Sequence, residues 1–265
     1  WKEKPPVVEN DDPVDRKDKE LLDISLMDRK ERDMYEIIQR VVDNGYLLEL
    51  KPLFAKNIII GFSRVDGRTV GIVANNPKVK DGAIDINSSD KAARFIRFCD
   101  CFNIPLIFFV DSVGLLPDKE EEKAGIERHA AKIPFAICES TVPKVTVYVG
   151  ECSGEAEYIM GTESMGVDVV VAWPNAGIGH IEPAYAVNII FEKEIKEAEN
   201  PDEIRKQKIE EFEAKYCNTY HAGSRQLIQD IINPEDTRPV VAQALDFFKD
   251  KEMIRPWKKH GNIPL

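Results

Sequence analysis

The sequence lacks the patterns that mark membrane-spanning and secreted proteins. It contains no run of eighteen apolar residues, so no segment is predicted to cross a membrane as a helix. No secretory signal pattern is visible either. The first residue is Trp1 rather than Met, which is typical of a fragment, a processed subunit or a sequence that begins part-way into its chain.

The sequence also lacks a cysteine framework. None of its cysteines forms a CxxC pair, and their number is odd, which favours a reducing compartment and a cytoplasmic location. Cys99 and Cys101 are expected on different faces of one helix, so neither a zinc site nor a redox pair is predicted there. The five cysteines are Cys99, Cys101, Cys138, Cys152 and Cys217.

Positive charge is in deficit. The 36 Lys and Arg residues are outnumbered by 47 Asp and Glu residues, which gives a formal net charge of -11. A charge of this sign repels nucleic acids and acidic membrane surfaces, so neither is an expected partner. It also repels coenzyme A, so any site for a CoA ester must be a local basic pocket or lie on another chain.

The chain divides into an arm and one large domain. Residues 1–28 are predicted to be a linker or wrapping arm, because their first 24 residues are rich in Pro, Asp, Glu and Lys. Residues 29–265 form the domain. Its first half is predicted as a helix over 31–44 and strands over 46–50, 57–64 and 69–74. Asp66-Gly67 is a strong signal for a hairpin turn between the last two strands.

Apolar strands then alternate with helices, which is typical of parallel βαβ units in an α/β fold. The strands are predicted at 105–110, 145–149 and 168–172. The helices are predicted at 88–102, 120–139 and 154–160, with Ser88 or Ser89 capping the first and a kink near Pro134 in the second. The last third is predicted to be helical over 182–199, 201–216, 224–232 and 239–249. In such folds ligands lie at the loops that follow the strands.

Several stretches resemble one enzyme family. They read KPLFAKNIIIGFSRVDGRTVGIVANNP (51–77), DGAIDINSSDKAARFIRFCDCFNIPLI (81–107), VDSVGLLP (110–117), AGIERHAAK (124–132), PKVTVYVG (143–150) and, at the end, RPWKKHGNIPL. This order resembles the C-terminal domain of the β subunits of biotin-dependent carboxyltransferases that act on propionyl-CoA and methylmalonyl-CoA. The resemblance covers residues 29–265 and is colinear.

The resemblance implies a crotonase-like ββα spiral with a helical C-terminal extension. Members of this family carry two such domains in tandem, and the C-terminal one binds mainly the carboxybiotin. The chain is therefore expected to need a separate N-domain subunit and a biotin carboxyl carrier protein, within a homo- or hetero-oligomer. The implied reaction moves a carboxyl group between carboxybiotin and the CoA thioester of a short acyl group, in either direction.

The resemblance also implies which residues form the site. Gly154, Glu155 and Ala156 match a Gly-Gly-Ala stretch whose backbone N–H groups stabilise the ureido oxygen, although Glu155 replaces a glycine. Gly125 is a further expected backbone donor. Asp111 and Gly114 keep part of an Asp-Val-Pro-Gly loop. Tyr158 stands at the position that helps to define the acyl pocket. His180 and Glu182 lie in a loop where the family has acidic residues at other positions.

These changed loops leave alternatives open. Glu151, Glu155, Glu157, His180 and Glu182 follow neighbouring strands, and such a cluster could bind a divalent metal or act as a general acid or base, although no metal is predicted. The changes are also typical of an assembly subunit that has lost catalysis. A third hypothesis is a CoA-ester enzyme of the crotonase fold that does not use biotin.

Overall fold

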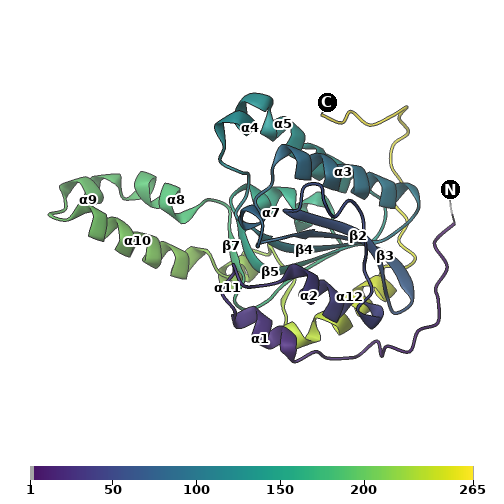
Figure 1. Cartoon of the computed structure of the whole chain (residues 1–265). Helices are drawn as coiled ribbons and strands as arrows, with labels where there is room; N and C mark the ends of the chain where they lie inside the picture. The colour runs from purple at the N-terminus through teal and green to yellow at the C-terminus, as the bar shows by residue number, and fades with distance from the viewer. Residues whose placement is uncertain (1–2, 265) are drawn as a thin grey trace.

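A computed structural model describes residues 3–264 of the chain. Its centre is one mixed sheet with the strand order β1-β2-β3-β4-β5-β6-β8, and β7 pairs with β5 beyond the end of β6. Helices cover both faces of this sheet, and an arm of further helices extends away from it (Figure 1). Within residues 3–264, every helix is too short or too polar to traverse a bilayer.

The antiparallel part of the sheet begins with a hairpin. Strands β2 (Ile58–Val65) and β3 (Arg68–Asn75) pair along their full length, and the short strand β1 (Leu48–Glu49) adds to β2. Asp66 and Gly67 both have positive φ angles, 51° and 71°, as a two-residue hairpin turn with the right twist requires. The predicted turn is confirmed.

The other strands are parallel, as the apolar runs at 105–110, 145–149 and 168–172 indicate. They are β4 (Leu106–Ser112), β5 (Lys144–Ser153), β6 (Val169–Ala172), β7 (Gly177–Gly179) and β8 (Asp230–Ile231). All seven residues of β4 are buried. Because these strands run in one direction, the carboxyl ends of β4, β5 and β7 meet at the same edge.

Two hydrophobic cores lie on opposite faces of the sheet. One is covered by α3 (Ile86–Cys101), α5 (Ile126–Ala130) and α6 (Lys132–Glu139). The other is covered by α1 (Glu20–Leu26), α2 (Met34–Val41) and α12 (Thr237–Phe247), which lie below the sheet in Figure 1. Residues of alternating strand positions fill the two cores, for example Phe108 on the first face and Phe109 on the second.

The start of α3 differs from the prediction that Ser88 or Ser89 caps it. Asp85 is the cap: its carboxylate accepts the Ser88 backbone N–H at 2.8 Å. The Ser88 hydroxyl in turn accepts the Asp85 backbone N–H at 2.8 Å, which completes a capping box. Ser88 therefore takes the third helical position rather than the cap.

The predicted single helix over 120–139 is wrong, but its predicted break near Pro134 is confirmed. The segment forms α4 (Lys119–Ala124), α5 and α6, with the first break at Gly125, whose φ is 88°. The second break is at Ala131, which places Pro134 as the third residue of α6, where no intrahelical bond needs its missing N–H. The left-handed glycine thus ends α4, and the proline lies in the first turn of α6.

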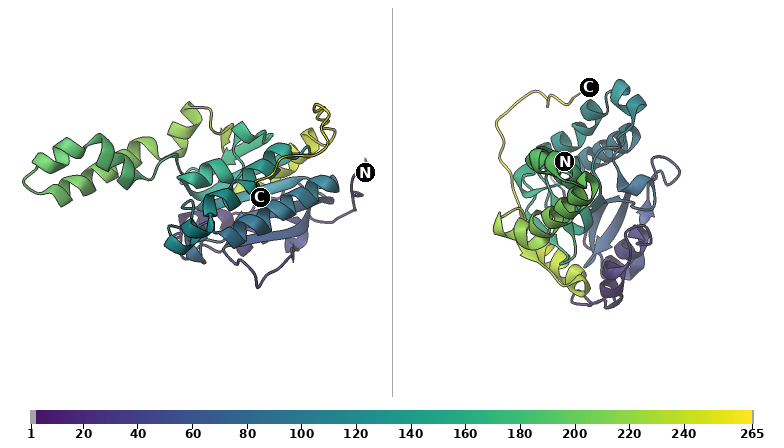
Figure 2. Two further views of the ribbon diagram at one scale, coloured as in Figure 1. Left: turned by 90° about the horizontal axis from the view of Figure 1, so that it is seen from above. Right: turned by 90° about the vertical axis from the view of Figure 1, so that its left-hand side faces the viewer.

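The C-terminal third contains one more error. The predicted helix over 224–232 is replaced by α11 (Thr219–Ser224), a turn with Gln226 at a φ of 61°, and strand β8. The predicted helix over 182–199 is two helices, α8 (Pro183–Ile190) and α9 (Glu192–Glu197), and α10 (Pro201–Tyr216) agrees with its prediction. Figure 2 shows α8, α9 and α10 extending from the rest of the molecule as an arm. The short remaining helices are α7 (Glu155–Ile159), η1 (Asp43–Gly45), η2 (Lys80–Gly82), η3 (Glu163–Met165) and η4 (Pro234–Asp236).

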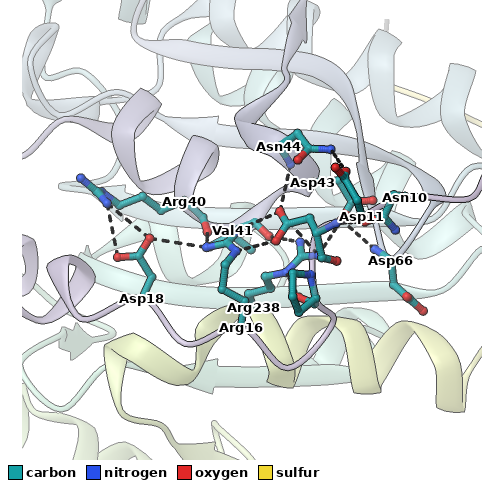
Figure 3. Close-up of polar contacts among 12 residues, drawn as sticks. Asn10, Asp11, Arg16, Asp18, Arg40, Val41, Asp43, Asn44, Asp66 and Arg238 are labelled. Atoms are coloured by element: carbon teal, nitrogen blue, oxygen red, sulfur yellow. Dashed lines mark hydrogen bonds and ion pairs between the residues drawn. The ribbon is translucent and has the colours of Figure 1, made fainter.

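A buried arginine ties the N-terminal segment to the domain (Figure 3). Arg238 of α12 is fully buried, and it donates to the Asp43 carboxylate at 2.8 Å and to the backbone oxygens of Val41, Pro13 and Asp12. Asp43 also accepts the backbone N–H groups of the hairpin turn. The Arg238–Asp43 ion pair thus joins the N-terminal segment at Asp12 and Pro13, the β2–β3 hairpin and α12.

Candidate functional site

Three strand ends converge at the carboxyl edge of the sheet. Ser112 at the end of β4 pairs with Cys152 of β5, and Ser153 of β5 pairs with Gly179 of β7. The Gly154 N–H then donates to the Gly179 carbonyl at 2.9 Å, so the loops after these strands stay together. This is the position where open α/β sheets bind ligands.

The Gly154–Ala156 turn leads from β5 into α7. Gly154 has a φ of 57° and a ψ of -133°, a conformation that favours glycine. Its own N–H is bonded to Gly179. Among the described residues, no acceptor is paired with the N–H groups of Glu155 and Ala156, which open α7. Glu155 is exposed, so its N–H group is a free donor of the kind that stabilises a developing oxyanion, whereas Ala156 is fully buried.

Gly114 lies directly against this turn. Its φ of 105° favours glycine, and its carbonyl accepts the Ile84 N–H at 2.9 Å. A Cβ at Gly114 would come within 2.8 Å of a Glu155 carboxylate oxygen and 3.4 Å of the Glu155 nitrogen. The exposed Glu155 side chain therefore leans over Gly114, and only a glycine there lets the two loops approach so closely.

The side chain of Asp111 is not placed to contact a substrate. It is fully buried, and its carboxylate is paired with Arg29 and, at 2.9 Å, with Arg32. It also accepts the Glu151 backbone N–H at 3.0 Å. Asp111 thus fixes the ends of β4 and β5 to the segment that carries the two arginines.

Glu151 contributes a second, half-buried carboxylate near this edge. A Cβ at Gly177 would lie 2.7 Å from a Glu151 carboxylate oxygen, so β7 runs directly over this side chain. Burial raises the pKa of Glu151, whereas the Ser153 hydroxyl and the charge of Arg29 act to lower it. The net direction is upward, which favours the protonated form relative to an ordinary glutamate.

His180 and Glu157 form a close pair across the two loops. The His180 Nδ1 atom lies 2.7 Å from a Glu157 carboxylate oxygen. The Glu157 side chain is only 4% exposed, whereas the His180 side chain is 47% exposed. The Tyr158 ring stacks on the imidazole at 5.6 Å between centroids, with an interplanar angle of 21°. Burial, followed by the charges of Glu157 and Glu155, raises the pKa of the Tyr158 phenol.

Two predicted site residues lie outside this constellation. The Gly125 N–H already donates to the Glu122 carbonyl at 3.0 Å, where it ends α4, so it is not a free donor. Glu182 is exposed at the start of α8, where its carbonyl accepts the Tyr185 N–H. Within residues 3–264, no group of three or more His, Cys, Asp or Glu side chains is arranged to hold a metal ion.

The prediction from sequence omitted Arg29 and Arg32 from its site, and it named Glu157 only in the alternative cluster of carboxylates with His180. The two arginines lie 82 and 79 residues before Asp111, and nothing in their spacing signals the ion pairs. Glu157 carried a usable signal, because a carboxylate in the first turn of a helix after a strand faces the same edge as His180. The loops thus bring together Gly114, Gly154, Glu155, Ala156, Tyr158 and His180 with Glu157.

The carboxyl transferase domain family matches residues 1–263, nearly the whole chain. The chain belongs to this family. The carboxyl transferase domain is 48% identical to the methylmalonyl-CoA decarboxylase subunit alpha of Propionigenium modestum, over 89% of this chain and 46% of that relative. It is 47% identical to the mitochondrial propionyl-CoA carboxylase beta chain of Homo sapiens, over 98% of this chain and 47% of that relative.

Solved structures agree with these relatives. A crystal structure of transcarboxylase 12S, described with methylmalonyl-coenzyme A and methylmalonic acid bound, matches with a TM-score of 0.94 and 44% identity. The match covers 99% of this carboxyl transferase domain and 51% of that chain. The beta subunit of geranyl-CoA carboxylase from P. aeruginosa, 24% identical with a TM-score of 0.80, shares the fold. The expected crotonase-like α/β fold is confirmed, and the chain spans about half the length of the relatives it matches.

Proposed function

We propose that this chain is the carboxybiotin-binding half of a biotin-dependent acyl-CoA carboxyltransferase. The observation that carries the proposal is the match of 99% of the chain, at a TM-score of 0.94, to one half of transcarboxylase 12S. That enzyme is described with methylmalonyl-CoA bound, and other relatives are named for propionyl-CoA. A short acyl-CoA is therefore the proposed substrate class.

The residues at the sheet edge fit a ureido group. Gly114 and Gly154 carry no side chain over the Glu155 N–H group, and a Cβ at Gly114 would lie 3.4 Å from that nitrogen. Biotin, when bound, carries the carboxyl group on a ureido nitrogen and takes negative charge on the ureido oxygen as that group leaves. The Glu155 N–H group, which belongs to an exposed residue, would hold this oxygen. The Glu155 carboxylate, at the same turn, opposes the charge.

The other half of the reaction needs a second domain. We propose that a separate chain supplies the family's other half and the coenzyme A site, since the net charge of -11 disfavours an anionic cofactor here. A biotin carboxyl carrier protein would deliver the carboxyl group. The complex would be an oligomer in a reducing compartment such as the cytoplasm, because all five cysteines are free.

The proposal is tested on the native complex. Its chains are identified by mass spectrometry after purification, and carboxyl transfer between free biotin and methylmalonyl-CoA or propionyl-CoA is then measured. We expect the complex to transfer the carboxyl group. When the biotin is attached to the carrier protein, avidin should abolish this transfer. Activity on these CoA esters that avidin leaves unchanged would overturn the biotin-dependent assignment and favour a biotin-independent enzyme. A complex whose only transferase activity comes from another chain with its own C-terminal half would make this chain an assembly subunit.

A further inference from the structure

The Glu157–His180 pair is the strongest side-chain constellation at the sheet edge that the proposed oxyanion site does not use. A short contact of 2.7 Å joins a buried carboxylate to a half-exposed imidazole. Glu157 has little access to water, so its contact with His180 Nδ1 replaces a hydrogen bond that water would otherwise make. The pair has the geometry of a carboxylate that orients a histidine.

This geometry selects one tautomer of the imidazole. A carboxylate accepts hydrogen bonds, so the Nδ1 atom must carry the proton, and the Nε2 atom of the neutral ring keeps its lone pair. The stacked Tyr158 ring limits rotation about the side chain and holds the ring plane. His180 is therefore fixed with Nε2 turned away from Glu157 and able to exchange a proton.

The pair lies at the same turn as the proposed oxyanion site. His180 follows Gly179, whose carbonyl accepts the Gly154 N–H, and Glu157 follows Ala156 in α7. Two hydrogen-bonded loops thus carry the imidazole and the Glu155 N–H group. The half-exposed imidazole keeps its outer nitrogen unpaired with Glu157, on the side of the molecule where Glu155 is also exposed.

We infer that His180 is a catalytic acid–base residue and that Glu157 is its positioning residue. The inference rests on the proposed function. The neutral His180 would accept at Nε2 the proton that the acyl carbon loses as it gains the carboxyl group. It would then give this proton to the ureido nitrogen that has released the carboxyl group. One N–C bond and one C–H bond break, one C–C bond and one N–H bond form, and the pair returns to its first state.

The tautomer is the first test, and it needs no activity. The chain has four histidines, so the imidazole nitrogens are resolved by NMR on the full chain labelled with ¹⁵N. At alkaline pH, where imidazoles are neutral, we expect His180 to carry its proton on Nδ1. In Glu157→Leu no side-chain acceptor faces Nδ1, and the proton should move to Nε2. An Nε2 proton in the unaltered chain, or a tautomer unchanged by Glu157→Leu, overturns the inference.

Two substitutions then test whether His180 transfers a proton or only holds the two loops together. In His180→Asn the amide N–H replaces Nδ1 and keeps the contact with Glu157, but Nε2 is gone. In His180→Gln the amide reaches the Nε2 position without a transferable proton. We expect both to lower avidin-sensitive transfer in the native complex about a hundredfold or more, with thermal unfolding unchanged for His180→Asn. The matched control is His221→Gln, because His221 packs edge-on against Tyr216 in the α10–α11 region.

The outcomes distinguish this inference from the proposed function. If His180→Asn transfers within about threefold of the unaltered complex, the pair only holds the loops together. That result would overturn the inference and leave the proposed function standing. An unaltered complex without any avidin-sensitive transfer would overturn the proposed function. It would also remove the reaction that the inference needs, even if the NMR result supported the pair.

Discussion

The carboxylate of Glu155 stands where the family resemblance implies a glycine. It is exposed and leans over Gly114, beside the N–H group proposed to hold an oxyanion. A negative charge there raises the energy of the developing oxyanion, although solvent screens it. We expect Glu155→Gln to increase carboxyl transfer roughly three- to tenfold, a change of about 1 kcal/mol in the barrier.

The control for this prediction is Glu163→Gln, which removes an exposed glutamate from η3 at a different turn. It should leave transfer unchanged, measured with the same complex and substrates. A fall in transfer for Glu155→Gln would instead give the carboxylate a chemical role in the reaction.

Lys144 is a buried lysine that has no part in the proposed site. Its ammonium group caps the end of α6 by donating to the carbonyls of Ile137 and Ser140, at 3.0 and 2.9 Å. Burial lowers its pKa to about 8 from the ordinary 10.5. The unfolded chain therefore binds more protons at this group between pH 8 and 10.5, and the contribution of Lys144 to stability rises with pH in that window.

The consequence is measurable as a difference between two proteins. The free energy of unfolding of the unaltered chain minus that of Lys144→Met should grow between pH 7 and 10.5. Its upper bound is roughly 3 kcal/mol, from a shift of about 2.5 units at 1.36 kcal/mol each. Urea unfolding at several pH values gives both free energies. A difference that is flat or falls across this range would show that Lys144 titrates like an exposed lysine.

The residue scale also shows the limits of reading a site from sequence. Glycine positions such as Gly114 and Gly154 are predictable, because a glycine between a strand and a helix signals a tight turn. The role of Asp111 is not, because its partners Arg29 and Arg32 come from a segment about 80 residues away. Only the packing of that segment against β4 turns Asp111 from an expected substrate contact into a buried anchor.

At the scale of elements, periodicity locates strands and helices but not always their ends. The β2–β3 hairpin and the buried strands follow from alternation, apolar runs and the Asp66-Gly67 turn. The segment 224–232 misleads, because its apolar residues fit a helix as well as a strand. The pairing of β8 with β6 decides between them, and this contact is about 60 residues apart in sequence.

The N-terminal segment is held by an element-level device, the charge network of Arg238 (Figure 3). Burial acts to raise the pKa of Asp12, but the Arg16 hydrogen bond and the Asn44 N–H outweigh it, and the pKa lies below its usual value. Arg238→Met removes a fully buried partner of Asp43 and leaves that carboxylate with its two backbone donors.

We expect Arg238→Met to lower the free energy of unfolding by about 3 kcal/mol, as when one partner of a buried ion pair is removed. The matched control is Arg225→Met, an exposed arginine just after α11, which should change it by about 0.5 kcal/mol or less. Urea unfolding measures both variants. Equal stability of Arg238→Met and the unaltered chain would mean that the segment is held by its other contacts, such as the packing of α1.

At the scale of the whole molecule, the arm formed by α8, α9 and α10 is the feature that a single chain does not explain. Helix α10 has no buried residue, and α8 leaves large apolar side chains in solvent. Tyr185, Ile189 and Ile190 are 64%, 77% and 62% exposed. Apolar groups gathered on a projecting element are typical of a surface that another protein covers.

If the chain works within an oligomer, as proposed, this exposed surface should promote self-association when the partner is absent. We expect the isolated chain at tens of micromolar, roughly the range where weak interfaces form, to have a mass above 30.1 kDa by light scattering after size-exclusion chromatography. The double substitution Ile189→Ser and Ile190→Ser should shift it toward the monomer without a change in circular dichroism. Lys206→Ser, an exposed change on α10, should not. If the unaltered chain is a monomer, the arm does not drive self-association. The free energy gained by burying its apolar side chains would then be too small to hold two copies together.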